Sequence, residues 1–223
     1  MQTERNGWAT GLALCAIVAW DLTGWDVPVA KWFGTTHGFA LRQHWLFTTV
    51  LHDGGRYLAW ALVLALCGGA MLPFGPLRRL SGSRRLQLAL TPIAAALLVS
   101  SIKATSASSC PWDMQTFGGI ARHVSHWQWT LPDGGSGRCF PAGHAAAGLS
   151  FIGGYFVYLA QPRIARRWLL GAMLAGALFG LAQQVRGAHY LSHTLWSAWL
   201  CWTVAWLGDL GHQRLVGVRQ VRA

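Results

Sequence analysis

Charged side chains are scarce in this sequence, and acidic ones are the scarcest. Of the 223 residues, 11% are charged, and 7 are Asp or Glu against 18 Lys or Arg. A water-soluble globular domain carries more charge than this. The sequence also has no internal repeat, no low-complexity tract and no shift in composition that would mark a second domain. These absences exclude a soluble globule and a repeat protein, and we expect one membrane-embedded domain over residues 1–223.

Hydrophobic residues take the place of the missing charges. They make up 53% of the sequence, which contains 14 Trp and has a mean hydropathy of +0.33. A stretch of about 20 apolar residues crosses a bilayer as a helix, and we identify six such stretches: residues 8–25, 57–74, 86–102, 144–160, 168–185 and 194–210. No cleavage site follows the first stretch, so we expect it to be retained. The expected fold is all-α, a polytopic membrane protein with a bundle of six transmembrane helices.

The basic residues explain the net charge of +11 without a nucleic-acid partner. They gather after the second span, after the fourth span and at the end of the chain: Arg78, Arg79, Arg84, Arg85, Arg163, Arg166, Arg167, Arg214, Arg219 and Arg222. With six spans, all three groups fall on one side of the membrane, which the positive-inside rule makes cytoplasmic. The loops at residues 103–143 and 186–193 then face outward.

The segment between the first two spans also faces outward. Its apolar part, residues 39–50, is expected to lie along the surface as an amphipathic helix. His52, Asp53 and Arg56 follow at the start of the second span. We expect them to form a salt-bridged interface cluster, with membership of a functional site as the alternative.

The cysteines divide into two groups by position. Cys15, Cys67 and Cys201 fall within predicted spans, where Cys behaves as a small apolar residue. Cys110 and Cys139 lie in the long outward loop, and an oxidising compartment would allow them to pair. Such a bridge stabilises the loop by about 3 kcal/mol in the chain-entropy model. We expect this disulfide, with two free thiols as the alternative.

Three clusters of polar residues stand at the outward ends of apolar stretches. They contain Lys103, Gly143, His144, Arg186, His189 and His193. Backbone N–H groups at the start of a helix attract phosphate oxygens, and a histidine beside fixed cations is able to accept a phosphoryl group. The clusters therefore indicate phosphate chemistry at a membrane surface.

Each cluster also has a plainer interpretation. Lys103 alone is typical of a cation that reaches the membrane interface, and His144 alone is typical of a helix cap. His189 and His193 are spaced i, i+4, which suits a polar seam between helices or a zinc site. A zinc helix of this spacing normally has Glu between its histidines, and this sequence has none there. We therefore expect no metal and no cofactor.

In their order and spacing, the clusters resemble the signature of the type 2 phosphatidic acid phosphatase superfamily. This superfamily includes membrane lipid phosphatases, soluble acid phosphatases and haloperoxidases, and its signature is Lys-x6-Arg-Pro, Pro-Ser-Gly-His and Ser-Arg-x5-His-x3-Asp. Here Lys103 is followed after six residues by Cys110-Pro111, and Pro141-Ala142-Gly143-His144 gives the second part. In the third part, His189 matches the second histidine of the family.

The sequence departs from this signature at four positions. Cys110, Ala142, Gln183 and His193 stand where the family has Arg, Ser, Arg and Asp, respectively. Arg186 lies one helical turn from Gln183 and is the expected substitute for one arginine. Arg138 or Arg122, in the outer loop, is the expected substitute for the other.

The resemblance implies a reaction through a phosphohistidine. His189 would attack the phosphorus in line, and His144 would protonate the leaving oxygen. Lys103, Arg186, Gly143 and Arg138 would bind the phosphate group. His193 would orient His189, although His193 itself is the alternative nucleophile.

The enzyme implied is a lipid phosphatase of a bacterial inner membrane, with its active site facing the periplasm. Its partners would be membrane lipids and a lipid phosphate substrate such as undecaprenyl diphosphate, phosphatidic acid, phosphatidylglycerol phosphate or a lipid A phosphate. A lipid phosphotransferase would use the same histidines. A catalytically inactive lipid-phosphate-binding protein is the alternative of another class. A small transporter is a third alternative, but transporter sites lie near the bilayer midplane, whereas these clusters gather at one surface, which disfavours it.

Overall fold

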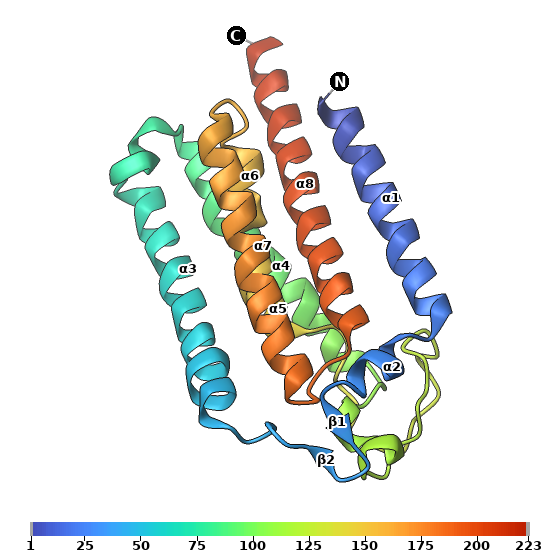
Figure 1. Cartoon of the computed structure of the whole chain (residues 1–223). Coiled ribbons are helices and arrows are strands. Elements are labelled where there is room, and N and C mark those ends of the chain that lie inside the picture. Colours follow the sequence, from blue (N-terminus) through green and yellow to red (C-terminus); the bar gives the residue numbers. More distant parts are fainter. Residues whose placement is uncertain (1, 222–223) are drawn as a thin grey trace.

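The computed structural model describes residues 2–221, which form a bundle of long helices (Figure 1). The bundle contains α1 (Gln2–Thr23), α3 (Gly55–Met71), α4 (Gly82–Thr105), α5 (Gly143–Leu149), α6 (Gly153–Val157), α7 (Pro162–Val185) and α8 (Leu191–Val221). Each of the six apolar stretches identified in the sequence lies mostly within helices. The expectation of a mostly helical fold is therefore confirmed.

Three helical stretches of the described chain are long and apolar enough to cross a membrane: Leu46–Arg79, Gly82–Thr105 and Pro162–Val185. They contain the second, third and fifth predicted spans. The first, fourth and sixth predicted spans correspond to α1, α5 with α6, and α8. Their crossing of the membrane stays a prediction.

The second span begins earlier than the sequence pattern predicts. A π-helix, η1 (Leu46–Gly54), runs directly into α3. The predicted surface helix at residues 39–50 is therefore wrong. Phe39 belongs to the short strand β2 (Gly38–Phe39), which pairs with β1 (Gly34–Thr35), and residues 46–50 belong to η1. The sequence pattern started the second span too late, because it took the polar residues His52 and Asp53 as the boundary of the span. These residues lie within the helical stretch.

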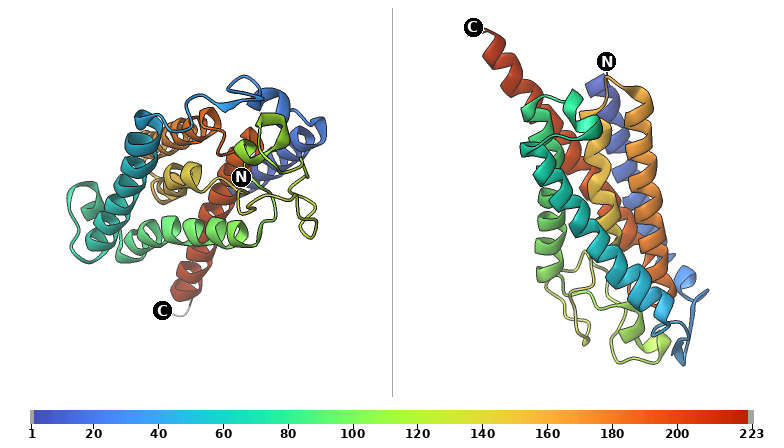
Figure 2. Two further views of the ribbon diagram at one scale, coloured as in Figure 1. Left: turned by 90° about the horizontal axis from the view of Figure 1, so that it is seen from below. Right: turned by 90° about the vertical axis from the view of Figure 1, so that its left-hand side faces the viewer.

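The central helix of the bundle is α5. It contacts α3, α4, α7 and α8, and the view along the bundle shows it surrounded by them (Figure 2). Small residues make this possible, because a Cβ on Gly148 would lie 2.6 Å from the backbone nitrogen of Gly176 on α7. One 3-10 turn, η5 (Ser150–Ile152), joins α5 to α6.

The loops of the two ends of the bundle differ in character (Figure 1). At one end lie the basic connections, including the 3-10 helix η2 (Gly75–Arg79), together with both termini. Arg222 and the side chain of Arg219, which belong to the third basic group, lie outside the described part of the chain. At the other end lie α2 (Asp26–Ala30), the two strands, η3 (Pro111–Asp113) and η4 (Gln115–Phe117). All three polar clusters from the sequence are at this second end.

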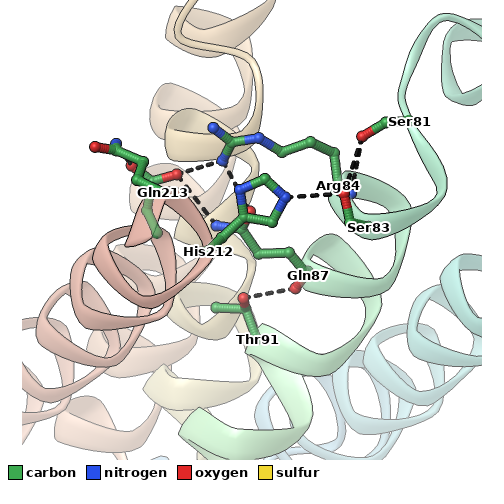
Figure 3. A network of polar contacts seen from close by, with 8 residues as sticks. Ser81, Ser83, Arg84, Gln87, Thr91, His212 and Gln213 are labelled. Carbon is green, nitrogen blue, oxygen red and sulfur yellow. Dashed lines mark hydrogen bonds and ion pairs between the residues drawn. The ribbon is translucent and has the colours of Figure 1, made fainter. Parts of the chain in front are cut away.

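A network of polar side chains joins α4 to α8 at the basic end of the bundle. We call this end of the bundle the arginine end. Figure 3 shows Arg84 and Gln87 of α4 beside His212 and Gln213 of α8. Arg84 forms an ion pair with Asp209, whose side chain is 3% exposed. Gln213 donates a hydrogen bond of 2.6 Å to the same carboxylate. The buried charges of this end are therefore paired within the protein.

Candidate active site

Two histidines form the centre of the other end of the bundle. Nδ1 of His189 lies 3.3 Å from Nδ1 of His193, and both side chains are buried. The chain reaches this position through a turn at Gly187, where φ is +75° and a Cβ would collide with Phe39. Asp26 of α2 fixes the start of α8 by accepting hydrogen bonds from the backbone and side chain of Ser192.

The environment of His189 keeps its imidazole neutral. Burial, and after it the charges of Lys103, His193 and His144, lowers the pKa of His189 well below its usual range. A neutral imidazole has a free electron pair on one ring nitrogen. His189 is therefore suited to act as a nucleophile at neutral pH.

His144 begins α5 beside this pair. The backbone N–H of Ala142 donates to the carbonyl of His193 at 3.2 Å, and the Ser197 hydroxyl donates to the carbonyl of Ala142 at 3.0 Å. These bonds attach the start of α5 to α8. Nε2 of His144 is buried and has no hydrogen-bond partner among the residues that the structure describes. A buried polar atom of this kind calls for a ligand.

An aromatic contact holds His144 in place. The ring of His52, in η1, stacks on the ring of His144 with 3.7 Å between the ring centroids and 25° between the planes. Nδ1 of His52 lies 2.9 Å from a carboxylate oxygen of Asp53, and Arg56 reaches the same oxygen at 3.8 Å. The expected cluster of charged residues is therefore present, and it also touches a predicted site residue.

Two cations lie near the histidines without a carboxylate partner. Lys103 ends α4, and its Nζ lies 4.0 Å from the point where a Cβ on Gly143 would be. Arg186 is buried; its Nε donates to the carbonyl of Arg42 at 3.0 Å, and its Nη1 donates to Oε1 of Gln183 at 3.2 Å. Within residues 2–221, the structure shows no ion pair for Lys103 or Arg186.

Arg138 takes a different position from these two cations. Its backbone N–H donates to the carbonyl of Ser106 at 2.7 Å, and its side chain is exposed on the outer loop. Among the described residues, no contact joins it to the histidines. The same holds for Arg122, which is also exposed. Of the three arginines, Arg186 is therefore the one that the structure places near the histidines.

A disulfide closes the outer loop over the site. Cys110 and Cys139 are bonded, with 5.2 Å between their Cα atoms. The sulfur of Cys139 lies 3.6 Å from Nδ1 of His189. Cys139, His189 and His193 thus have the proximity of metal ligands, but a disulfide sulfur is not a thiolate. These residues do not fit a zinc site.

An apolar groove runs between α3, α5 and α7. It has a volume of about 630 Å³. Gly55 and Ala147 line it near His52 and His144, whereas Phe74 and Arg167 line it at the basic end of the bundle. The groove is large and apolar enough to hold a hydrocarbon chain.

Comparison with known proteins agrees with this site. A family model described as the PAP2 superfamily matches residues 85–215, which is more than half of the chain. The chain belongs to this superfamily, and the resemblance found in the motifs is confirmed. Members of the superfamily are generally phosphatases, often acting on lipid phosphates. No curated protein and no solved structure matches the chain.

Sequence reasoning identified five residues that the structure brings together, and it missed others. Lys103, Gly143, His144, His189 and His193 gather at one end of the bundle, with Arg186 beside them. The stack between His52 and His144 joins residues 92 positions apart and has no sequence pattern. The burial of Asp21 was also missed: this charged residue of the first predicted span is 4% exposed, and its carboxylate accepts a hydrogen bond from Trp127 of the outer loop.

Proposed function

We propose that this protein is a membrane phosphatase that removes a phosphate or pyrophosphate group from a lipid through a phosphohistidine at His189. The observation that carries the proposal is the gathering of a neutral histidine and two cations without carboxylate partners at one end of the bundle. A buried cation with no internal counterion is costly. An anionic substrate group would supply that counterion when it binds.

We assign each step of the proposed reaction to a side chain. Nε2 of His189 attacks the phosphorus, a P–N bond forms, and the P–O bond to the lipid breaks. His144 gives a proton to the leaving oxygen and then, as a base, takes one from the water that releases phosphate from His189. Lys103 and Arg186 stabilise the charge on the equatorial oxygens throughout. No step requires a metal ion.

The apolar groove between α3, α5 and α7 favours a lipid over a soluble phosphate ester. Its volume of about 630 Å³ suits a hydrocarbon chain, which a soluble substrate lacks. The basic loops at the far end of the bundle, taken with the positive-inside rule, support an outward active site in a bacterial inner membrane. The disulfide supports the same orientation, because disulfides form in the periplasm.

The test is phosphate release by the purified protein in detergent micelles. The substrates are undecaprenyl diphosphate, phosphatidic acid, phosphatidylglycerol phosphate and lipid A, each compared with His144→Ala, His189→Ala and His193→Ala. We expect turnover of at least one lipid, its loss in the first two variants, and an acid-labile phosphoenzyme that is absent from His189→Ala.

Three outcomes would contradict the proposal. Binding without turnover by the unmodified protein would indicate a lipid-phosphate-binding protein. Transfer of the phosphoryl group to a second lipid, without release of phosphate, would indicate a phosphotransferase. A phosphoenzyme that survives in His189→Ala and is lost in His193→Ala would make His193 the nucleophile.

A further inference from the structure

A second, smaller cavity is lined in part by His193. Its volume is about 60 Å³, enough for a few water molecules. Among the residues that line it are two carboxylates, two further histidines and a tyrosine, together with His193: Asp21, Asp26, His123, His126 and Tyr190. Apart from Tyr190 and His193, its lining residues come from α1, the start of α2, the turn between them and the outer loop, and none of these residues is a fixed position of the three motifs.

One carboxylate of this cavity has an uncommitted buried oxygen. Oδ2 of Asp21, near the end of α1, lies 2.9 Å from Nε1 of Trp196, 3.1 Å from Nε1 of Trp127 and 3.2 Å from Nε2 of His126. Oδ1 of Asp21 is buried and has no hydrogen-bond partner within the described chain. A carboxylate buried with half of its acceptors unused is strongly disfavoured unless another donor reaches it.

The second carboxylate is already committed. Asp26 accepts hydrogen bonds from the backbone and hydroxyl of Ser192 and, at 3.0 Å, from Nε1 of Trp20. Both of its oxygens therefore hold the start of α8. Of the two acids that line the cavity, Asp21 is the one with an acceptor to spare.

The histidine pair needs such an acceptor. When His189 attacks through Nε2, its Nδ1 carries the proton and donates to Nδ1 of His193 across their 3.3 Å contact. Nδ1 of His193 is then an acceptor, so the proton of His193 is on Nε2. This N–H requires an acceptor of its own, and His193 lines the cavity that contains Asp21.

We propose that Asp21 is the positioning residue of the reaction: through the small cavity it fixes His193 as the Nε2–H tautomer and thereby orients His189. The proposal rests on the proposed function of His189. The link from Nε2 of His193 to Oδ1 of Asp21 passes through water in the cavity. His126 borders this path, because it bonds to Asp21 and its ring lies edge-on to His193 with 6.2 Å between centroids.

The proposal also explains how the positive charge that develops on His189 is stabilised. Attack on phosphorus leaves the imidazole of His189 with a positive charge. The side chains whose charges act on it are Lys103, His193 and His144, and the backbone of Cys139 provides one hydrogen bond. None of these is an acid. The buried carboxylate of Asp21, acting through His193, supplies the missing negative charge from α1.

Asp21→Asn tests the proposal, because it keeps the shape of the side chain and removes its charge. We expect kcat to fall about 10- to 100-fold with KM changed less than about twofold. In a His193→Ala background, Asp21→Asn should have no further effect on kcat, since its route to His189 is gone. Asp209→Asn is the matched control: it alters an equally buried carboxylate at the arginine end and should lower the Tm but not kcat.

A measurement on the unmodified protein covers the case in which Asp21→Asn fails to fold. Nitrogen-15 NMR of labelled histidines in micelles reports the tautomer of His193 directly. The Nε2–H form supports the proposal whether or not lipid turnover is found, and the Nδ1–H form overturns it. Turnover that is lost in His189→Ala but unchanged in Asp21→Asn would overturn the role of Asp21 and leave the proposed function intact.

Discussion

The two ends of the helix bundle both bury charged side chains, and they satisfy them in opposite ways. At the arginine end, Arg84 has Asp209 as its partner, and Gln87 and Gln213 also donate to that carboxylate (Figure 3). At the other end, which we call the histidine end, Arg186 contacts neutral oxygens of Arg42 and Gln183. The first arrangement is complete without a ligand, whereas the second has a positive charge left over.

This difference separates structural charge from functional charge. Replacing one member of a buried ion pair leaves its partner uncompensated, so stability falls. Replacing a cation that has hydrogen bonds but no ion pair among the described residues leaves no buried charge uncompensated, so stability falls less while anion binding is lost. The same type of substitution at the two ends therefore differs in its effects on stability and on activity.

Arg186→Met should produce the largest change in activity. Loss of one donor to the developing charge on phosphate lowers kcat by about 100- to 1000-fold. The Tm should fall less than in Arg84→Met, because only the hydrogen bonds to Arg42 and Gln183 are lost and no ion pair is broken. Steady-state phosphate release and thermal unfolding, measured on the same preparation, check both parts.

The exposed arginine of the outer loop provides the comparison for Arg186. Arg138→Met removes a guanidinium that has no contact with the histidines, so kcat should change less than about threefold. A loss as large as that of Arg186→Met would restore Arg138 as a phosphate ligand. A collapse in the Tm of Arg186→Met would instead make Arg186 a structural residue.

Arg84→Met should have the largest effect on stability. It leaves Asp209 buried without its partner, which costs about 3 kcal/mol. The double variant Arg84→Met/Asp209→Leu should recover most of that loss, because both charges are gone. Chemical denaturation in detergent gives the free energies of unfolding, and kcat should be unchanged in the material that remains folded. Failure of the double variant to recover would mean that packing, rather than pairing, is what the network supplies.

His52→Ala should have an intermediate effect on activity. Loss of the stack frees His144 to take other orientations, and an aromatic pair contributes up to about 1.5 kcal/mol, or about tenfold in kcat. His52→Phe keeps a ring over His144 and should recover activity to within about threefold of the unmodified protein. An equal loss in both variants would show that the polar atoms of His52, bonded to Asp53, matter more than its ring.

His52 also marks the limit of what the sequence could predict. Apolar stretches predicted the helices, because helix length and hydropathy are local properties. Spacing predicted His189 and His193 as neighbours for the same reason. The contact between His52 and His144 depends on how α3 packs against α5, and the burial of Asp21 depends on how α1 packs against α8. Such tertiary contacts between distant segments leave no periodic signal in one sequence.

Ala59→Phe tests whether the apolar groove holds the lipid chain. The larger side chain takes the space of at least one methylene group, which weakens binding by about 0.8 kcal/mol, or about fourfold. We therefore expect KM for a long-chain lipid phosphate to rise about fourfold, with no change for a soluble aryl phosphate. Ala61→Phe, on the exposed face of the same helix, is the control. If Ala59→Phe affects both substrates equally, the groove does not bind the chain.

The smallest expected change is the response of the histidine end to mild acid. Because burial lowers the pKa of His189, this side chain stays neutral in the folded protein below pH 6.5, where a free imidazole becomes charged. The rate of phosphoenzyme formation should therefore change less than about twofold between pH 7 and pH 6.

The free energy of unfolding, unlike this rate, should depend on pH in the same range. The unfolded chain takes up a proton at this position as the pH falls through about 6.5 and the folded chain does not, so the free energy of unfolding decreases. Single-turnover phosphorylation and thermal unfolding across pH 5.5–7.5 measure the two effects, and a phosphorylation rate that halves at pH 6.5 would show that His189 titrates as an exposed histidine.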